Sequence, residues 1–416
     1  QLATMITELE RVKNSPEGRA RLAVLHAVKQ AIAERGGAMN CASLAAALLS
    51  SLAELQDEET SSAVLFLLTH ILQHVGPNLL RNKLESLVDV VGKAISNFSS
   101  SASVARHGDH CMFIIAKSQE PTAWRGPEIS IIVDLLLSHS VDTRPKVRKS
   151  AQGFIVSLIS EEGQAVEVAR SFIESKVMSF SSSVFKSCTG TETVTALQLL
   201  GMIRDVSPFF SAKAIQSIAQ NLVKMLSSDN GKMSQHVYSC LDSMMQVGEE
   251  DGETVWSEKL LSRIIAAGVS SRPNVLSGSE SIVACFRFLL TAVAKLQERS
   301  SMAAAEAASL VFGSVSDYML PSPSGSDEIA VAAANLLCDT IDVCIKSDIV
   351  EEAAANSKAS TVVESVVSHA VDMLHPRFKK HWHCTLAVSQ SLFNRFHARS
   401  SLLLMPLLHA LLPIFQ

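Results

Sequence analysis

The fold of this chain is decided by the stretch Val141-Asp142-Thr143-Arg144-Pro145-Lys146-Val147-Arg148-Lys149-Ser150-Ala151-Gln152. An apolar stretch, 131–137, leads into it, and a second, 147–159, leads out of it. Pro suits the first turn of a helix, because its φ is already fixed there and its missing N–H would have no partner. The pattern predicts two helices joined by a turn, with an Asp in the turn and a Val-Arg pair at the start of the second helix.

The same arrangement recurs along the chain at a regular spacing. Apolar residues follow helical periodicity, and polar turns separate the apolar runs. Successive second helices are about 41 to 51 residues apart, close to the ~40–47 of HEAT and armadillo repeats. We therefore predict an all-α, HEAT/armadillo-like α-solenoid superhelix of about nine helix pairs, in a single continuous array over 1–416. The second helices are predicted to begin near Glu17, Glu59, Val104, Lys146, Thr191, Lys232, Glu280, Asp327 and Phe378.

Composition narrows the function. Apolar residues make up 47% of the chain and charged residues 19%, and the formal net charge is -5. A globally basic nucleic-acid binder is excluded, so any RNA contact must come from local patches. No apolar run is long enough to span a bilayer, and no signal peptide opens the chain, so we expect no membrane partner. Because the chain begins at Gln1 and ends in an apolar run, we expect a fragment of a longer protein.

Motifs for catalysis and cofactor binding are not found in the sequence. It contains no phosphate-binding loop, no nucleophile elbow, no HExxH and no kinase signature. The densest group of possible metal ligands is His375, His381, His383 and Cys384. On one helix His381 and His383 would point about 200° apart, so they would not share a metal ion. We predict that the chain is not an enzyme and has no catalytic residue, metal or cofactor.

Two basic clusters are candidate binding sites. A row of helix pairs could present such residues to phosphates. In the first cluster, Asp142 and Arg148 are expected to be structural, because in HEAT repeats the turn Asp and the Arg six residues later join adjacent repeats. Aromatic residues near the second cluster, such as Phe378 and Trp382, follow the spacing of a helix core stripe and not of a base-stacking platform. The predicted RNA-binding or partner-binding residues are Arg144, Lys146, Lys149, Arg377, Lys379 and Lys380.

Two stretches go beyond a generic repeat array. One is 144–152, and the other is Leu374-x3-Phe378-x3-Trp382-x3-Leu386-x6-Phe393, followed by the apolar run 402–412. Together they resemble the N-terminal half of the ribosomal RNA-processing protein twelve family, which comprises HEAT/armadillo-repeat factors of ribosome biogenesis. The segment 195–209 fits the same family pattern. The region that most resembles the family is 135–416, and the preceding residues match only as helix pairs.

The resemblance implies a role for the chain. It implies a non-catalytic scaffold that binds pre-ribosomal RNA and assembly factors in the small-subunit processome and supports export of the pre-ribosome. The implied location is the nucleus and nucleolus, with shuttling to the cytoplasm. The implied partners belong to a large ribonucleoprotein complex, together with a small GTPase or export receptor. Two alternatives stay open, a karyopherin-like nuclear transport receptor and a HEAT scaffold for a cytoskeletal or phosphatase complex.

Overall fold

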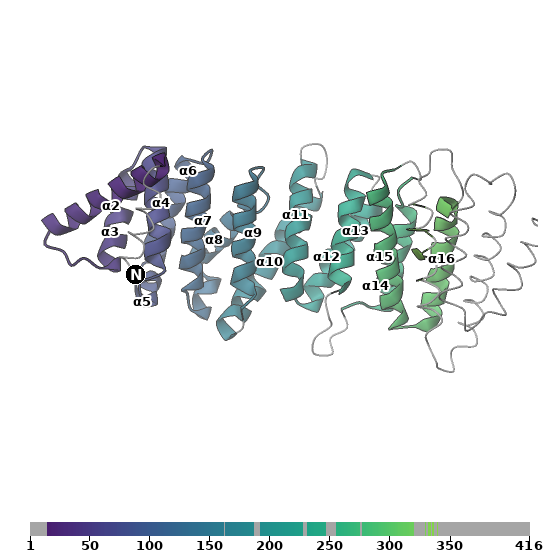
Figure 1. Ribbon diagram of the computed structural model, residues 1–416. Helices are drawn as coiled ribbons and strands as arrows, with labels where there is room; N and C mark the ends of the chain where they lie inside the picture. The colour runs from purple at the N-terminus through teal and green to yellow at the C-terminus, as the bar shows by residue number, and fades with distance from the viewer. Residues whose placement is uncertain are drawn as a thin grey trace, which may run out of the picture. The chain divides into compact units, whose positions relative to one another are not determined.

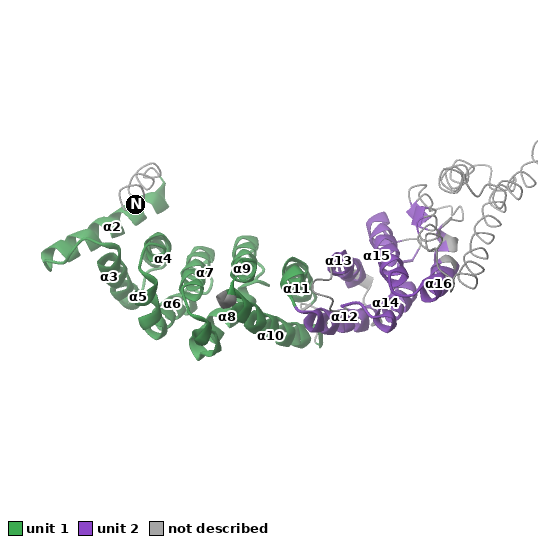
Figure 2. Cartoon of the chain, turned by 90° about the horizontal axis from the view of Figure 1, so that it is seen from below, with its two compact units in different colours: residues 1–210 green, residues 211–416 purple. Residues whose placement is uncertain are grey.

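A computed structural model describes residues 15–161, 163–186, 192–227, 231–246, 255–274, 277–319 and six single positions between 329 and 339. Within these residues the regular elements are all helices, joined by short turns (Figure 1). The chain divides into two compact units, residues 1–210 and 211–416, which Figure 2 colours separately. Each unit is described in turn.

Unit 1 is built from two rows of helices. The second helix of each pair forms one row, the second-helix row, in which α2, α4, α7, α9 and α11 each pack on the next. The first helices form the other row, the first-helix row, in which α3, α6, α8 and α10 do the same (Figure 2). The elements are α2 (Pro16–Glu34), α3 (Cys41–Glu54), α4 (Glu58–Leu72), α5 (Pro77–Asn82), α6 (Leu84–Asn97), α7 (Ala102–Lys117), η1 (Pro121–Arg125), α8 (Pro127–His139), α9 (Pro145–Ile159), α10 (Gln164–Lys186), α11 (Glu192–Val206) and η2 (Ser207–Phe209).

Unit 2 repeats the two-row plan. Its second helices α13 and α15 pack on each other, and α14 packs on both α12 and α16. Aromatic side chains fill the space between α13 and α15, where Tyr238 and Phe288 are both fully buried. The described helices are α12 (Ala212–Ser227), α13 (Gly231–Gln246), α14 (Glu258–Ser270), α15 (Ser279–Gln297) and α16 (Ser301–Met319).

The predicted fold class is confirmed. Six of the predicted second-helix starts fall on described residues, and each lies within two residues of the observed start: Pro16, Glu58, Ala102, Pro145, Gly231 and Ser279. The start predicted near Thr191 is next to the observed start of α11, at Glu192. The starts near Asp327 and Phe378 lie outside the described residues. The number of nine pairs and a single array over 1–416 stay predictions.

Local capping explains where the helices begin and end. Asn40, Asp57 and Ser101 each accept a hydrogen bond from the backbone N–H three residues on, at 2.9, 2.7 and 3.3 Å. These side chains satisfy N–H groups that have no partner inside the helix. At the end of α2, Gly36 has a φ of 64°, a left-handed conformation that glycine adopts without steric cost.

Neighbouring repeats are joined at the same period that the sequence shows. The Lys176 amine donates to Asp134, which precedes it by 42 residues, and the Thr291 hydroxyl donates to Asp242, which precedes it by 49. Close packing accompanies these bonds. Within one repeat, a Cβ placed on Gly108 in α7 would lie 2.5 Å from the Ile95 side chain on α6, so a larger residue would force that side chain to move. Polar contacts thus join neighbouring repeats, and close apolar packing joins the two helices of a repeat.

Among the described residues, no helix combines the length and the apolar character that crossing a bilayer requires.

Candidate nucleic-acid interface

The turn before α9 is held by Arg144. The Asp142 carboxylate accepts hydrogen bonds from the backbone N–H, Nε and Nη2 of Arg144, at 2.7, 2.9 and 2.7 Å. Arg144 Nη1 donates to the carbonyls of Ser99 and Ser100, at 3.0 and 2.8 Å, in the turn of the preceding repeat. The hydrogen bond from Arg144 holds the pKa of Asp142 below its usual range. The side chain of Arg144 thus fastens two repeats.

The Arg148 side chain makes a different contact from the one expected. Its Nη1 donates to the Asp142 carbonyl at 2.8 Å, in the turn of its own repeat. A helical side chain points back toward the N-terminus, so Arg148 reaches its own turn and not the neighbouring one. Among the hydrogen bonds of the described residues, Arg144, supported by Asp142, makes the inter-repeat contact predicted for Arg148. The predicted contact of Arg144 with RNA stays a prediction.

Lys146 and Lys149 lie on the first two turns of α9, and both are exposed. Neither amine forms an ion pair with a described residue. Their predicted contact with phosphate stays a prediction. Arg377, Lys379 and Lys380 lie outside the described residues. The histidine and cysteine group at 375–384 and the aromatic stripe predicted after Leu374 lie outside them as well.

A strip of partly exposed rings and cations crosses the second-helix row of unit 1. At its α2 end, the Arg21 guanidinium lies 3.7 Å from the centre of the Phe66 ring on α4. Phe66 is 4.7 Å from the His70 ring on α4 and 5.3 Å from the His107 ring on α7, measured between centroids. We call the full set the aromatic strip; its members are Arg21, Phe66, His70, His107, His110, Phe113 and Phe154, all partly exposed.

The other half of the aromatic strip joins α7 to α9. The Phe154 ring stacks on His110 and on Phe113, with centroids 5.0 Å apart in both pairs and interplanar angles of 25° and 19°. Lys117 lies 5.9 Å from the Phe113 ring centre and also pairs with Glu161. Three helices that are adjacent in the row, α4, α7 and α9 (Figure 1), therefore carry rings that touch from one helix to the next.

The charge of the aromatic strip comes from arginine at neutral pH. Burial, together with the nearby charges of Arg106 and Arg21, lowers the pKa of His107 to about 4. Burial also lowers the pKa of His110. Both imidazoles are thus neutral rings at pH 7. Among the described residues Arg21 and Arg106 form no ion pair, although Glu17 lies close enough to offset part of the Arg21 charge.

Sequence reasoning missed the aromatic strip. The signal was present, because Phe66 and His70 are four residues apart, and His107, His110 and Phe113 are spaced by three. Such spacing places side chains on one helix face, but it does not tell a core face from an exposed one. Only the packing of the second-helix row shows that these rings stay partly exposed.

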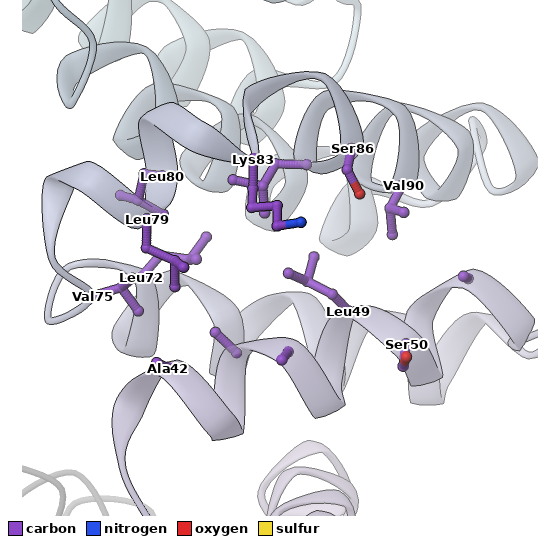
Figure 3. Close-up of a pocket in the computed structure, with 14 residues that line it drawn as sticks. Ala42, Leu49, Ser50, Leu72, Val75, Leu79, Leu80, Lys83, Ser86 and Val90 are labelled. Atoms are coloured by element: carbon purple, nitrogen blue, oxygen red, sulfur yellow. The ribbon is translucent and has the colours of Figure 1, made fainter.

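An apolar groove lies on the first-helix row, between α3, α5 and α6 (Figure 3). Its volume is about 360 Å³. Leu72, Val75, Leu79 and Leu80 gather at one end, and the Lys83 amine lies across the groove from Leu49. The groove is thus lined mainly by aliphatic side chains, whereas the aromatic strip consists of rings and cations.

A buried ion pair supports the inner side of α7. The fully buried Asp109 carboxylate lies 2.7 Å from Nδ1 of His139 on α8, while its other oxygen has no hydrogen-bond partner. Burial raises the pKa of Asp109, and the hydrogen bond with His139 opposes that shift. The pair joins two neighbouring helices. Across the part of the chain that the structure describes, no cluster of three metal-ligating side chains occurs.

Similar proteins share both the fold and the family pattern. The chain is similar to the RRP12-like proteins of Homo sapiens, at 25% identity over 61% of this chain, and of Gallus gallus, at 29% over 51%. These matches span about a fifth of the length of the curated relatives, at 20% and 17% respectively.

The fold is similar to two crystal structures of the karyopherin Kap121p. One is bound to the SUMO protease Ulp1p (TM-score 0.57, 11% identity, 99% of this chain and 40% of that one), the other to Pho4p (TM-score 0.51, 9%, 97% and 43%).

Family profiles match most of the chain. The profile for RRP12-like N-terminal HEAT repeats matches residues 9–251, and the profile for ribosomal RNA-processing protein 12 HEAT repeats matches residues 323–414. The first match includes the segment before residue 135, where sequence patterns alone indicated only helix pairs. The expected resemblance is confirmed. With a HEAT-type helical array in the structure and a family match over more than half of its length, this chain belongs to the RRP12-like family of HEAT-repeat proteins.

Proposed function

We propose that the chain is part of a non-catalytic scaffold in ribosome biogenesis. It holds pre-ribosomal RNA and small-subunit assembly proteins within the processome, and it supports nuclear export of the pre-ribosome. Its place is the nucleus and nucleolus, with passage to the cytoplasm. The observation that carries the proposal is the match of 9–251 and 323–414 to repeats of ribosomal RNA-processing proteins.

The architecture suits such a role. In a repeat array each helix pair contacts only its neighbours, so successive helices present an extended surface instead of one enclosed pocket. In unit 1 the second-helix row offers the aromatic strip together with Lys146 and Lys149, and the first-helix row offers the apolar groove. Two chemically different surfaces allow an RNA and a protein to be held at once. We propose that this holding, and not a reaction, is what the chain contributes.

The proposal is tested by recovery from cells. The tagged full-length protein is cross-linked and purified, and the bound RNA and proteins are identified. We expect pre-ribosomal RNA and small-subunit assembly factors. A folded bait that recovers neither would overturn the proposal. The double variant Lys146→Glu/Lys149→Glu, with Arg19→Glu/Lys29→Glu on α2 as a charge-matched control, tests the predicted phosphate contacts. We expect only the first pair to reduce RNA recovery.

A second function is a karyopherin-like transport receptor. It is favoured by the fold likeness to Kap121p and by the apolar groove, which would accept a hydrophobic peptide. A receptor of this kind binds the GTP form of a small GTPase more tightly than the GDP form. If the purified chain binds the two forms equally, or binds neither, the transport-receptor function is excluded.

A further inference from the structure

We propose that the aromatic strip of unit 1 is a binding site for single-stranded RNA, in which unpaired bases stack on its rings and on the Arg21 plane. The inference rests on the proposed function, since it names the site and the form of RNA that the scaffold would hold. It adds the rings and Arg21 to the predicted lysines on the first turns of α9.

The first argument is a set of partly exposed faces for stacking. The Arg21 guanidinium lies over the Phe66 ring, 3.7 Å from its centre. Unpaired bases stack on aromatic rings and on arginine planes of this kind. At the other end of the strip the Phe154 ring lies nearly parallel to the His110 and Phe113 rings, at 25° and 19°, whereas His107 meets Phe66 edge-on, at 81°.

The second argument is charge. Burial lowers the pKa of Arg21, and the nearby positive charge of Arg106 adds to that shift while Glu17 opposes it. Neither arginine forms an ion pair with a described residue. Two positive charges held near each other are stabilised by a bound anion such as a phosphate. Lys146 and Lys149 add two exposed amines on α9, the helix that also carries Phe154. Along a helix, Lys146 and Phe154 are about 12 Å apart, which is within reach of one nucleic-acid strand.

The third argument is the placing of acidic residues. Glu17, Asp57, Glu58 and Glu59 line a hollow where α2 and α4 begin, and Arg21 lines the same hollow. Their charges repel phosphates at that end of the helices. The strand is thus directed across the row, from Arg21 toward α7 and α9. Adjacent helices pack about 8–10 Å apart, so the four helices from α2 to α9 offer a track of roughly 25–30 Å.

Single-stranded RNA accounts for these features better than a duplex or a protein. A duplex hides the faces of its bases, so it would use the charges and leave the rings without a partner. An acidic peptide would use Arg21 and Arg106, but it would not need neutral imidazole rings between phenylalanines. Rings on successive helices with cations beside them are the arrangement that sequence-tolerant RNA binding uses.

The test measures binding of the purified full chain to a labelled twelve-nucleotide oligouridine by fluorescence anisotropy. We expect Phe66→Ala/Phe154→Ala to weaken binding by about tenfold or more. The matched control is Phe172→Ala, because Phe172 is also partly exposed and has Lys176 5.7 Å from its ring centre, but it lies on α10 in the first-helix row. We expect the control to bind as the wild type does. Phe66→Trp/Phe154→Trp, which keeps large rings, should retain binding.

Two further variants separate stacking from charge. Arg21→Lys keeps the positive charge but loses the plane, so we expect weaker binding with an unchanged salt dependence. Lys146→Ala/Lys149→Ala should make the slope of log K against log salt shallower by about one to two, since each phosphate contact on a single strand contributes about 0.7. Thermal unfolding of each variant confirms that the fold is retained.

Several results would overturn the inference. They are unchanged oligouridine binding by the folded Phe66→Ala/Phe154→Ala variant, an equal loss with Phe172→Ala, tighter binding of an RNA duplex than of the single strand, and displacement by an acidic peptide but not by unlabelled oligouridine. Failure of the proposed function is distinguishable. In that case the ring-dependent binding of oligouridine persists, but the wild-type bait recovers no pre-ribosomal RNA from cells.

Discussion

Unit 1 and unit 2 use the same ring stacking in opposite environments. In unit 2 the Tyr238 and Phe288 rings lie 5.4 Å apart at 29°, and both are fully buried between α13 and α15. In unit 1 the Phe113 and Phe154 rings lie 5.0 Å apart at 19° between α7 and α9, and both are partly exposed. Two neighbouring second helices thus bury their stacked rings in unit 2, but leave them partly exposed in unit 1.

The difference indicates that buried rings stabilise the fold, whereas partly exposed rings are available for binding. A buried ring contributes through the apolar area that it removes from water, and its loss leaves a cavity. A partly exposed ring contributes less to folding, because water already reaches part of it. Several such rings that touch at the surface mark a candidate binding site. Four changes in unit 1 and unit 2 would break or sharpen this comparison.

The largest effect is expected for Phe288→Ala in unit 2. Phe288 is fully buried and stacks on Tyr238, so its removal should lower the free energy of unfolding by about 3–5 kcal/mol. Urea unfolding followed by circular dichroism measures the change. Phe154→Ala in unit 1 is the matched variant and should cost about 1 kcal/mol, because the ring is already partly in water. Equal losses in the two variants would show that exposure does not separate the two stacks.

A pH effect is expected from His107. Its pKa is about 4 in the folded chain, below the ordinary 6.5, because of burial and of the charges on Arg106, Arg21, His110 and His70. Between these values the unfolded chain binds more protons than the folded one. Stability is therefore full above pH 6.5 and falls as the pH drops toward 4, by on the order of 3 kcal/mol. His107→Phe keeps a ring and removes the proton site, so it should unfold like the wild type at pH 8 and resist unfolding better at pH 5.

A smaller effect is expected at the turn before α9. Arg144→Met would remove the side-chain donors of the Asp142 carboxylate and of two carbonyls in the turn of the preceding repeat, at a cost of about 2–3 kcal/mol. Arg148→Met removes hydrogen bonds only within one turn and should cost about 1 kcal/mol. Chemical unfolding of the two variants compares them directly. If Arg148→Met proved the more damaging, the assignment of Arg144 as the inter-repeat contact would be wrong.

The smallest effect is expected for Lys117→Ala. Lys117 pairs with Glu161 at the surface, where both side chains are about half exposed, and exposed pairs contribute about 0–1 kcal/mol. Thermal unfolding should detect little change, and oligouridine binding should fall modestly, since one cation near Phe113 is lost. A large loss of stability would mean that this end of the aromatic strip is part of the core.

The sequence determined the helices better than the roles of their side chains. The starts of seven second helices were predictable because apolar spacing and capping residues such as Asp57 act within a few residues. The role of Arg144 was not, since its partners Ser99 and Ser100 lie 45 and 44 residues earlier in the chain. The aromatic strip was missed for a related reason. Helical spacing puts His107 and His110 on one face, but only the neighbouring helices decide how far that face is covered.

The hydrogen bonds between neighbouring repeats have a consequence for how the chain is made. Their partners lie 42 to 49 residues apart, as in Lys176 with Asp134 and Thr291 with Asp242. A ribosome releases the chain from its N-terminus at about 5–20 residues per second, so each new helix pair finds its partner already synthesised within seconds. Assembly can then proceed by addition of one pair to the last. A protein that belongs to a ribosome-assembly family would thus itself be built in step with translation.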